Sequence, residues 1–287
     1  MKKINSFIIV GGDGRQLYMA DYLSSLGYKI TLYGLPEKNH KCAENIRNAI
    51  NESDCIIFPL PVTKDDKYIF SIVPIKETAD EIFSMINENQ LVFAGMLGKG
   101  FETKIKKKTD SVYDYFKFEE VTVMNTVPTV QGIIKAMIDN IEYTIHSSSC
   151  AVFGYGRVAR LTADTLSALG ANVTVAARKS GDIATAKTKG YKGIYISDFW
   201  KHANKFDIII NTVPSLVINK KILESVRNEC LIIDVASAPF GTDFACAYEL
   251  GINAIQCSSL PGKVAPKTAG KIIADGILNI ITEGEYE

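Results

Sequence analysis

The stretch Cys150–Ser180, CAVFGYGRVARLTADTLSALGANVTVAARKS, constrains the fold more than any other part of the chain. Its apolar start, 150–153, is short enough for a buried parallel strand, and residues 154–159 follow as G-x-G-x-x-A. In such a turn the first glycine allows the tight bend, the second admits a pyrophosphate, and the small third residue lets the helix pack on the sheet. We therefore predict a dinucleotide-binding βαβ unit. Its expected cofactor contacts are Gly154, Tyr155, Gly156, Arg157 and Val158.

The end of the second strand of this unit distinguishes between the two nicotinamide dinucleotides. NAD-binding proteins carry an acidic residue there for the ribose 2′-hydroxyl, whereas this chain continues from Ala177 with Arg178, Lys179 and Ser180. Arg178 can offer a planar fork to a 2′-phosphate, Lys179 adds positive charge, and Ser180 can donate a hydrogen bond. We therefore predict NADP as the cofactor. The alternative is a Rossmann-like fold whose glycine turn no longer binds a dinucleotide.

Three later segments are expected to reach the same ligand. Residues 211–215 and 234–237 follow the fourth and fifth strands of this domain, and the carboxyl ends of such strands face the ligand crevice. The third segment is a predicted loop, 260–270, whose two prolines fix its path and whose glycine permits close backbone approach, although it could also be a rigid connector. The cofactor contacts predicted from these segments are Thr212, Val213, Pro214, Ala236 and Val264.

The chain uses one plan twice. Residues 7–34 repeat the order of apolar strand, glycine turn, amphipathic helix ending in Leu-Gly, and second strand. The similarity between the two halves extends further, because the sequence of 53–63 matches that of 205–215 and the sequence of 89–96 matches that of 228–237. We therefore predict an α/β protein with two Rossmann-like, doubly wound parallel-sheet domains and an interdomain cleft. Alternatively, the two halves are similar only because all segments of parallel α/β proteins resemble one another, and this explanation predicts the same fold class.

The segment between the two halves suggests where the domains meet. Residues 121–125 read as a strand, after which Pro128 is predicted to hold Val127 extended and to open a long helix. A second helix is predicted at 267–282, from apolar residues at helical spacing, and we expect it to pack back on the first domain. The predicted domains are 1–127 with the C-terminal helix 267–287, and 128–266.

The glycine turn of the first half, residues 11–15, differs from the dinucleotide pattern. Asp13 lies inside it and would repel a pyrophosphate, so a small polar substrate fits this turn better. Arg15 is then a natural partner for a carboxylate, and Asp13 an acceptor for a ring N–H or hydroxyl. Alternatively, Asp13 caps the following helix and Arg15 is solvated.

Candidates for proton transfer are His146, Lys263 and Lys267. His146 precedes the strand at 150 and so lies at the amino edge of the sheet, which favours a structural role. Lys267 and Thr268 begin the last helix, where an anion can bind. We therefore predict Lys267 as the catalytic residue, either holding a substrate carboxylate or polarising a reacting group. Alternatively, Lys267 is simply solvated, because the positive end of a helix does not favour a cation.

Composition excludes several classes of protein. Lys+Arg and Asp+Glu are both 32, so no global charge favours nucleic acid or an anionic membrane. The six cysteines are scattered without a metal-ligand spacing, which argues against zinc. No apolar segment approaches the roughly 20 residues that span a bilayer, so we expect a cytoplasmic protein.

Motifs along most of the chain resemble the dipicolinate synthase A-subunit family of spore-forming bacteria. They are GGDGRQ at 11–16, NTVPTVQG at 125–132, YTIHSS at 143–148, GYGR at 154–157, AARKS at 176–180, NTVPS at 211–215, GTDF at 241–244 and LPGKVAPKTAG at 260–270. One departure is Ala-Pro-Phe at 238–240, where the resemblance leads us to expect Arg-Pro-Gly.

The resemblance implies an NADP-dependent oxidoreductase at a branch of the lysine pathway. It would form dipicolinate from dihydrodipicolinate, or from its hydroxylated tetrahydro precursor, in the mother cell during sporulation. It also implies a B subunit resembling a flavin-mononucleotide-binding protein, and self-association into a homo-oligomer is a further option. The groups expected to bind this small dicarboxylate are Gly12, Asp13, Arg15, Asn125, Thr129 and Thr268.

Two other functions compete with this one. The first is a nucleotide-binding regulatory or scaffold subunit for the flavoprotein partner, because no obvious acid or base stands out in the sequence. The second is a methylenetetrahydrofolate or shikimate-type dehydrogenase, which the proline-containing segment 260–270 suggests.

Overall fold

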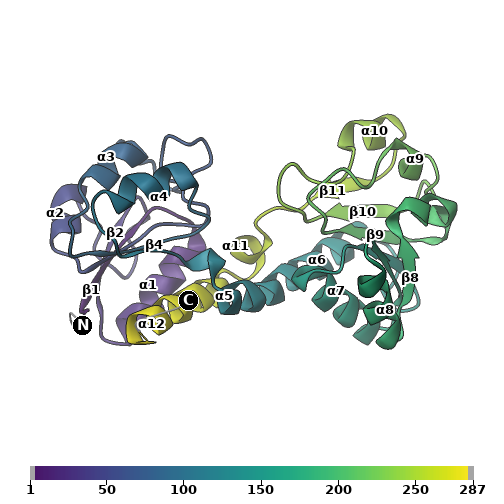
Figure 1. The fold of residues 1–287 in the computed structure, drawn as a ribbon, viewed down its shortest axis with the longest axis horizontal. Helices are drawn as coiled ribbons and strands as arrows, with labels where there is room; N and C mark the ends of the chain where they lie inside the picture. The colour runs from purple at the N-terminus through teal and green to yellow at the C-terminus, as the bar shows by residue number, and fades with distance from the viewer. Residues whose placement is uncertain (1–3, 284–287) are drawn as a thin grey trace. The chain divides into compact units, whose positions relative to one another are not determined.

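The computed structural model describes residues 4–283, which form two compact α/β units (Figure 1). Unit 1 contains the described residues up to Asn125 together with those from Ala265 onward, and unit 2 is Thr126–Val264. Each unit has one sheet whose paired strands all run parallel. The predicted fold class, two Rossmann-like parallel-sheet α/β domains, is confirmed.

Unit 1 is built on a five-stranded sheet in the order β2-β1-β3-β4-β5. Its strands are β1 (Ser6–Val10), β2 (Lys29–Tyr33), β3 (Cys55–Ile57), β4 (Leu91–Ala94) and β5 (Val112–Asp114). Its helices are α1 (Gly14–Ser25), α2 (Ile46–Asn51), α3 (Ala79–Ser84), α4 (Lys99–Lys106), α5 (Glu119–Met124) and α12 (Pro266–Glu283), with a 3-10 turn η1 (Tyr115–Lys117). The direction of winding reverses between β1 and β3, which makes the carboxyl ends of these strands the expected ligand edge.

Side chains of β1 alternate between two apolar clusters because successive strand residues point to opposite faces. Ile8 and Val10 join residues of α2, α3 and α4, whereas Phe7 and Ile9 join residues of α1 and α12. The last helix therefore packs against the first unit, alongside α1 (Figure 1). The approach is close, since a Cβ added to Gly270 would lie 2.3 Å from the Arg15 carbonyl oxygen.

Unit 2 has a six-stranded sheet in the order β11-β10-β9-β6-β7-β8. Its strands are β6 (Ser149–Phe153), β7 (Asn172–Ala177), β8 (Lys192–Tyr195), β9 (Ile208–Asn211), β10 (Leu231–Asp234) and β11 (Ala254–Gln256). Its helices are α6 (Thr126–Asn140), α7 (Arg157–Ala168), α8 (Ser180–Thr188), α9 (Lys220–Leu223), α10 (Phe244–Glu249) and α11 (Leu260–Val264), with 3-10 turns η2 (Ile196–Lys201) and η3 (Ala203–Lys205). This is the strand order of a dinucleotide-binding sheet, with its reversal between β6 and β9.

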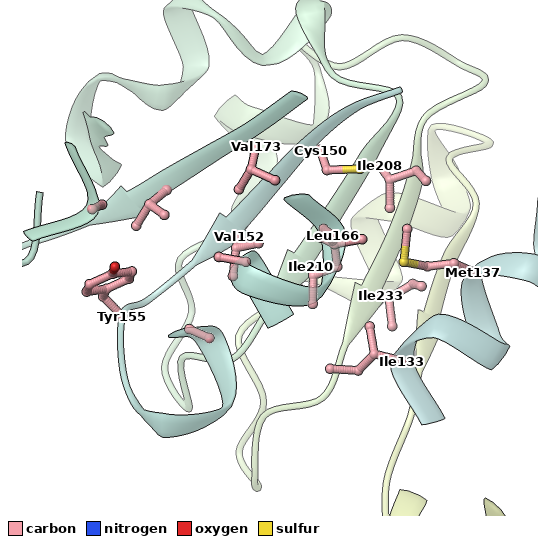
Figure 2. Packing of buried hydrophobic residues seen from close by; sticks show 14 of the residues in the cluster. Ile133, Met137, Cys150, Val152, Tyr155, Leu166, Val173, Ile208, Ile210 and Ile233 are labelled. Atoms are coloured by element: carbon pink, nitrogen blue, oxygen red, sulfur yellow. The ribbon is translucent and has the colours of Figure 1, made fainter. Parts of the chain in front are cut away.

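Figure 2 shows the apolar packing on one face of this second sheet. Val152 of β6, Ile210 of β9 and Ile233 of β10 form one cluster with Ile133 of α6 and Leu166 of α7, and all five are completely buried. Large side chains on neighbouring strands thereby fix the position of α6 and α7 over the sheet.

The strand predicted at 121–125 is wrong, because these residues belong to α5 and its C-cap. In a strand Val121 and Val123 would share a face, yet Val121 is buried and Val123 is 42% exposed. The extended geometry predicted at Val127 is also wrong, since α6 begins at Thr126. Pro128 is the third residue of α6, where the missing N–H has no partner within a helix anyway.

The segment 260–270, predicted as a loop, is mostly helical. It contains α11 and the first residues of α12, with Ala265 between them. Pro261 and Pro266 fall in the first turns of these helices, a position that tolerates proline because the N–H there has no partner within the helix. The prolines therefore start two helices rather than stiffen a loop.

Cysteine, metal and membrane features add little to this description. All six cysteines are free thiols. Between residues 4 and 283 no cluster of histidine, cysteine and carboxylate side chains has the makings of a metal site. Within the same residues, none of the helices combines the length and apolar character that crossing a bilayer requires.

Candidate functional site

The turn after β6 needs its first glycine for the fold itself. Gly154 has φ of +92°, a region that other residues rarely adopt, and its N–H donates to the Ala176 carbonyl oxygen (2.8 Å). A Cβ at this position would lie 2.7 Å from the Thr212 hydroxyl oxygen. Both backbone conformation and packing therefore demand glycine where β6, β7 and the loop after β9 meet.

The second glycine of the turn has no such internal reason. Gly156 has φ of −77°, which any residue adopts, and a Cβ there would meet nothing within 4 Å. Gly156 is also the N-cap of α7, and no side chain caps this helix. The open space beside Gly156 and the positive end of α7 therefore fit a pyrophosphate, which the backbone N–H groups can bind.

The other turn residues divide into buried and outward-facing ones. Tyr155 is buried, 5% exposed, and its side chain belongs to the apolar cluster of Figure 2. Its carbonyl oxygen accepts a hydrogen bond from Arg160 Nε (2.9 Å). Arg157 is exposed and Val158 half-buried in the first turn of α7.

The residues predicted to bind the 2′-phosphate follow β7, at the carboxyl edge of the same sheet. Ala177 is buried, whereas Arg178, Lys179 and Ser180 are all exposed. Lys179 is the N-cap residue of α8 and forms no side-chain cap, as expected because an ammonium group cannot accept a hydrogen bond from the helix N–H groups. Because β7 pairs with β6, two cations lie one strand away from the glycine turn.

The loop after β9 lies against the glycine turn. The Thr212 hydroxyl donates to the Phe153 carbonyl oxygen (2.8 Å), and Thr212 and Val213 are half-buried beside Gly154. Pro214 is exposed, and Ala236 after β10 is buried, 6% exposed.

Two buried polar residues, Asn211 and Asp234, support these loops; both begin segments predicted to reach the ligand, but neither is one of the predicted cofactor contacts. The signal that could have found them is a polar residue closing an otherwise apolar strand, as in IIIN and LIID.

The glycine turn of unit 1 is closed by the protein's own residues. Gly12 N–H donates to the Phe70 carbonyl oxygen (2.7 Å), and Ile72 N–H donates to the Gly12 carbonyl oxygen (3.0 Å). A Cβ on Gly12 would lie 2.3 Å from Gln16 Oε1. Gly12 is accordingly buried, and its glycine is explained by contacts inside the unit.

Asp13 and Arg15 bind each other. Asp13 is the N-cap of α1 in a capping box with Gln16, as one of the two sequence alternatives had it. Arg15 is not solvated as that alternative supposed: its side chain is 4% exposed, and its Nε and Nη2 each lie 2.9 Å from a carboxylate oxygen of Asp13. Nη2 also donates to the Leu60 carbonyl oxygen (2.6 Å).

The charge of Arg15 also sets the protonation of its partner. Burial raises the pKa of Asp13, but the hydrogen bonds and positive charge of Arg15 outweigh it, so the pKa lies below its usual value. This pair therefore stabilises the start of α1.

The remaining predicted residues differ in exposure. Lys267 and Thr268 are exposed in the first turn of α12, and Asn125, Thr129 and Val264 are half-buried. His146 is exposed ahead of β6, at the amino edge of its sheet, with Nδ1 2.9 Å from the Ser147 hydroxyl. Of the proton-transfer candidates, Lys267 is the one in the first turn of a long helix.

Comparison with known proteins identifies both units. Residues 6–116 match the family of the dipicolinate synthase A-subunit N-terminal domain. The dipicolinate synthase A subunit of Bacillus subtilis (strain 168) is 32% identical over 286 residues, covering 97% of this chain and 96% of the relative. The chain belongs to the dipicolinate synthase A-subunit family. The resemblance seen in the sequence motifs is confirmed.

Solved structures of this family have the same fold. The crystal structure of the dipicolinate synthase A chain from Bacillus subtilis is 33% identical, with a TM-score of 0.85, and covers 99% of this chain and 97% of that one. The A-subunit structure from Bacillus halodurans is 31% identical, also with a TM-score of 0.85, and covers 96% of this chain and 97% of that one.

The second unit carries the cofactor assignment. Residues 142–247 match a family described as "Putative NAD(P)-binding". The matched range includes the glycine turn after β6. Unit 2 is therefore an NAD(P)-binding domain. Together with the family membership, this makes the chain an NAD(P)-dependent oxidoreductase of the dehydrogenase type.

Proposed function

We propose that this member of the dipicolinate synthase A-subunit family oxidises dihydrodipicolinate, either supplied as such or formed from its hydroxylated tetrahydro precursor by loss of water, to dipicolinate with NADP⁺. The single observation that carries the cofactor choice is the pair of exposed cations, Arg178 and Lys179, one strand away from the open space at Gly156. When bound, NADP⁺ supplies a hydride acceptor at C4 of its nicotinamide ring. Loss of one hydride and one proton from dihydrodipicolinate leaves the aromatic pyridine ring.

The residues of unit 2 bind and orient the dinucleotide in this proposal. Backbone N–H groups at the start of α7 bind the pyrophosphate where Gly156 leaves space. Arg178 binds the 2′-phosphate through its planar fork, with Lys179 adding charge and Ser180 a hydroxyl. Thr212 and Val213 lie on the opposite side of Gly154 and support the other half of the cofactor.

Unit 1 supplies the groups that we assign to the substrate. Asp13 and Arg15 bind each other, which makes Lys267 the better placed cation for a substrate carboxylate. Lys267 and Thr268 are exposed at the N-terminal turn of α12, whose dipole also favours an anion. Asn125, the last residue of the first segment of unit 1, is the further residue that we assign to the substrate.

Titration with NADPH and NADH tests the cofactor assignment. We expect tighter binding of NADPH, and Arg178→Ala should weaken NADPH binding by about 10- to 100-fold, the value of a charge-assisted phosphate contact, while NADH binding stays constant. Lys205→Ala serves as the control. It removes an exposed cation that precedes β9, at the amino edge of the sheet. Equal binding of the two cofactors, or no binding of either, would contradict the proposal.

A second candidate function is a nucleotide-binding subunit that serves a flavoprotein B subunit in the mother cell. It is favoured by the internal pairing of Asp13 with Arg15, because each of these predicted substrate-binding groups already binds the other. Assays of this chain on dihydrodipicolinate, with and without the B subunit, separate the two functions. NADP⁺ reduction by this chain alone supports our proposal, and reduction that requires the B subunit supports the second.

A further inference from the structure

Two polar residues end neighbouring strands of the NAD(P)-binding sheet in full burial. Asn211 closes β9 and Asp234 closes β10, and the two residues lie opposite each other in the parallel register. Both are 0% exposed, although a buried amide or carboxylate is costly unless its polar atoms are hydrogen bonded. Their hydrogen bonds therefore indicate what these side chains hold in place.

Asp234 connects the two ends of the loop that follows β10. One carboxylate oxygen accepts the Ala236 N–H (3.0 Å) and the other accepts the Gly241 N–H (2.9 Å). Within residues 4–283 no lysine or arginine forms an ion pair with it. The buried charge is thus satisfied by the backbone of its own loop, which it fastens at both ends.

The loop after β9 is fastened to the same point. Asn211 closes its turn by accepting the Val213 N–H (3.0 Å) and donating to the Val213 carbonyl oxygen (3.1 Å). The Gly241 carbonyl oxygen accepts the N–H groups of Val217 (2.9 Å) and Ile218 (2.8 Å). A Cβ on Gly241 would lie 2.4 Å from both Asn211 Nδ2 and the Val213 carbonyl oxygen. The two loops therefore form one tightly packed block around Gly241.

This block lies on one defined side of the glycine turn. The sheet reverses its winding between β6 and β9, and a dinucleotide lies across such a reversal with one half on each side. The basic residues after β7 belong to the adenosine side, so the loops after β9 and β10 belong to the nicotinamide side. Thr212 and Val213, at 2.7 and 3.1 Å from a Cβ built on Gly154, bring the block up to the pyrophosphate position.

We propose that Asp234 is a positioning residue for the nicotinamide half of the cofactor. Its carboxylate holds the loop after β10, and through Gly241 the loop after β9, in the place that fixes the nicotinamide and its ribose. The proposal rests on nucleotide binding in unit 2 but not on the identity of the substrate. An isosteric Asp234→Asn change tests it, because an amide offers one acceptor and leaves one backbone N–H facing an NH₂ group.

Three probes separate the two halves of the ligand: 2′,5′-ADP carries only the adenosine half, whereas NADP⁺ and NADPH carry both. For Asp234→Asn we expect an unchanged dissociation constant for 2′,5′-ADP and binding of NADP⁺ and NADPH that is weaker by about tenfold, the value of one hydrogen bond to a charged group. The fluorescence of bound NADPH, which reports on the nicotinamide, should decrease in parallel.

Asp114 provides a matched control in unit 1. Its two carboxylate oxygens accept the Met96 and Leu97 N–H groups, both at 3.0 Å, which is the same kind of loop support. Asp114→Asn should leave all three probes unaffected. Pro239→Gly loosens the exposed tip of the loop after β10 without touching the carboxylate, and it should give the same selective loss if Asp234→Asn does not fold.

The outcomes separate this inference from the proposed function. Equal weakening of all three probes, or no weakening at all, would overturn the role of Asp234 and leave NADP binding intact as a conclusion. Selective weakening of NADP⁺ and NADPH supports it. Failure of the unmodified protein to bind any of the three probes overturns both proposals.

Discussion

Removal of the Asp13 carboxylate should destabilise unit 1 far more than loss of an ordinary helix cap. In Asp13→Ala, α1 loses its N-cap and the buried Arg15 guanidinium loses the carboxylate that lies 2.9 Å from both Nε and Nη2. Breaking a buried ion pair from one side costs about 3–5 kcal/mol. The Asp13 side chain is 21% exposed, so water can solvate part of the vacated space and we expect about 3 kcal/mol.

A second capping box in the same unit shows how much stability an N-cap contributes when no buried charge is involved. Thr78 caps α3 with Glu81 in the same way, but no buried cation depends on it. Thr78→Ala should therefore cost about 1 kcal/mol, the usual value of an N-cap. The double variant Asp13→Ala with Arg15→Met should recover most of the loss, because it removes the uncompensated charge as well.

Urea unfolding followed by circular dichroism measures these differences without adding salt. The single tryptophan, Trp200, lies in unit 2, so its fluorescence follows that unit and should show the same midpoint in all variants. The reasoning is refuted if Asp13→Ala costs no more than Thr78→Ala, or if the double variant is no more stable than Asp13→Ala.

The same pair predicts a pH dependence. Because the pKa of Asp13 is lowered in the folded protein, its contribution is complete above the unfolded value of about 3.9 and is lost as the pH falls through the folded value. The difference in unfolding free energy between the unmodified protein and Asp13→Ala should therefore shrink at acidic pH. A difference that stays constant down to the folded pKa would contradict this.

Three further changes test separate parts of the structure. Gly156→Ala should weaken NADPH binding at least tenfold by filling the open space, yet shift the unfolding free energy by only about 1 kcal/mol. Gly98→Ala, at the N-cap of α4 in unit 1, where a Cβ also meets nothing within 4 Å, is its control. Lys267→Met should depress turnover and leave NADPH affinity unchanged, and a pure loss of cofactor binding would reassign it. Gly270→Ala should cost about 1–3 kcal/mol in urea unfolding, because its Cβ would meet backbone atoms of α1; an unchanged midpoint would contradict that close packing.

The parts of the fold that follow from local rules could be predicted from the sequence. The turn at 154–159 is recognisable because each position obeys a steric rule that depends on a few neighbouring residues. The segment at 121–125 is not, because its two alternating valines imitate a strand. The folded chain shows the helix, because Asn125 N–H donates to the Val121 carbonyl oxygen (2.9 Å) and Val121 packs beside Gly276 of α12, which is distant in sequence.

The candidate site shows the same division. The exposed cations after β7 depend only on the end of one strand, so sequence reasoning could place them. The burial of the Arg15 side chain depends on contacts such as the hydrogen bond to the Leu60 carbonyl oxygen, 45 residues away in sequence. No local sequence pattern reveals that contact. Asn211 and Asp234 are recognisable as strand ends, but their hydrogen bonds to the following loops require the folded chain.

The position of α12 has a consequence for synthesis on the ribosome. Ile273, Ile277 and Ile280 belong to the same core as Phe7 and Met19, so the packing of β1 and α1 is completed only after α12 has been made. Unit 2, by contrast, is one continuous segment, Thr126–Val264, and can fold as soon as it emerges. We therefore expect unit 2 to complete its core before unit 1, in which the face of α1 that packs on α12 stays uncovered until α12 is made.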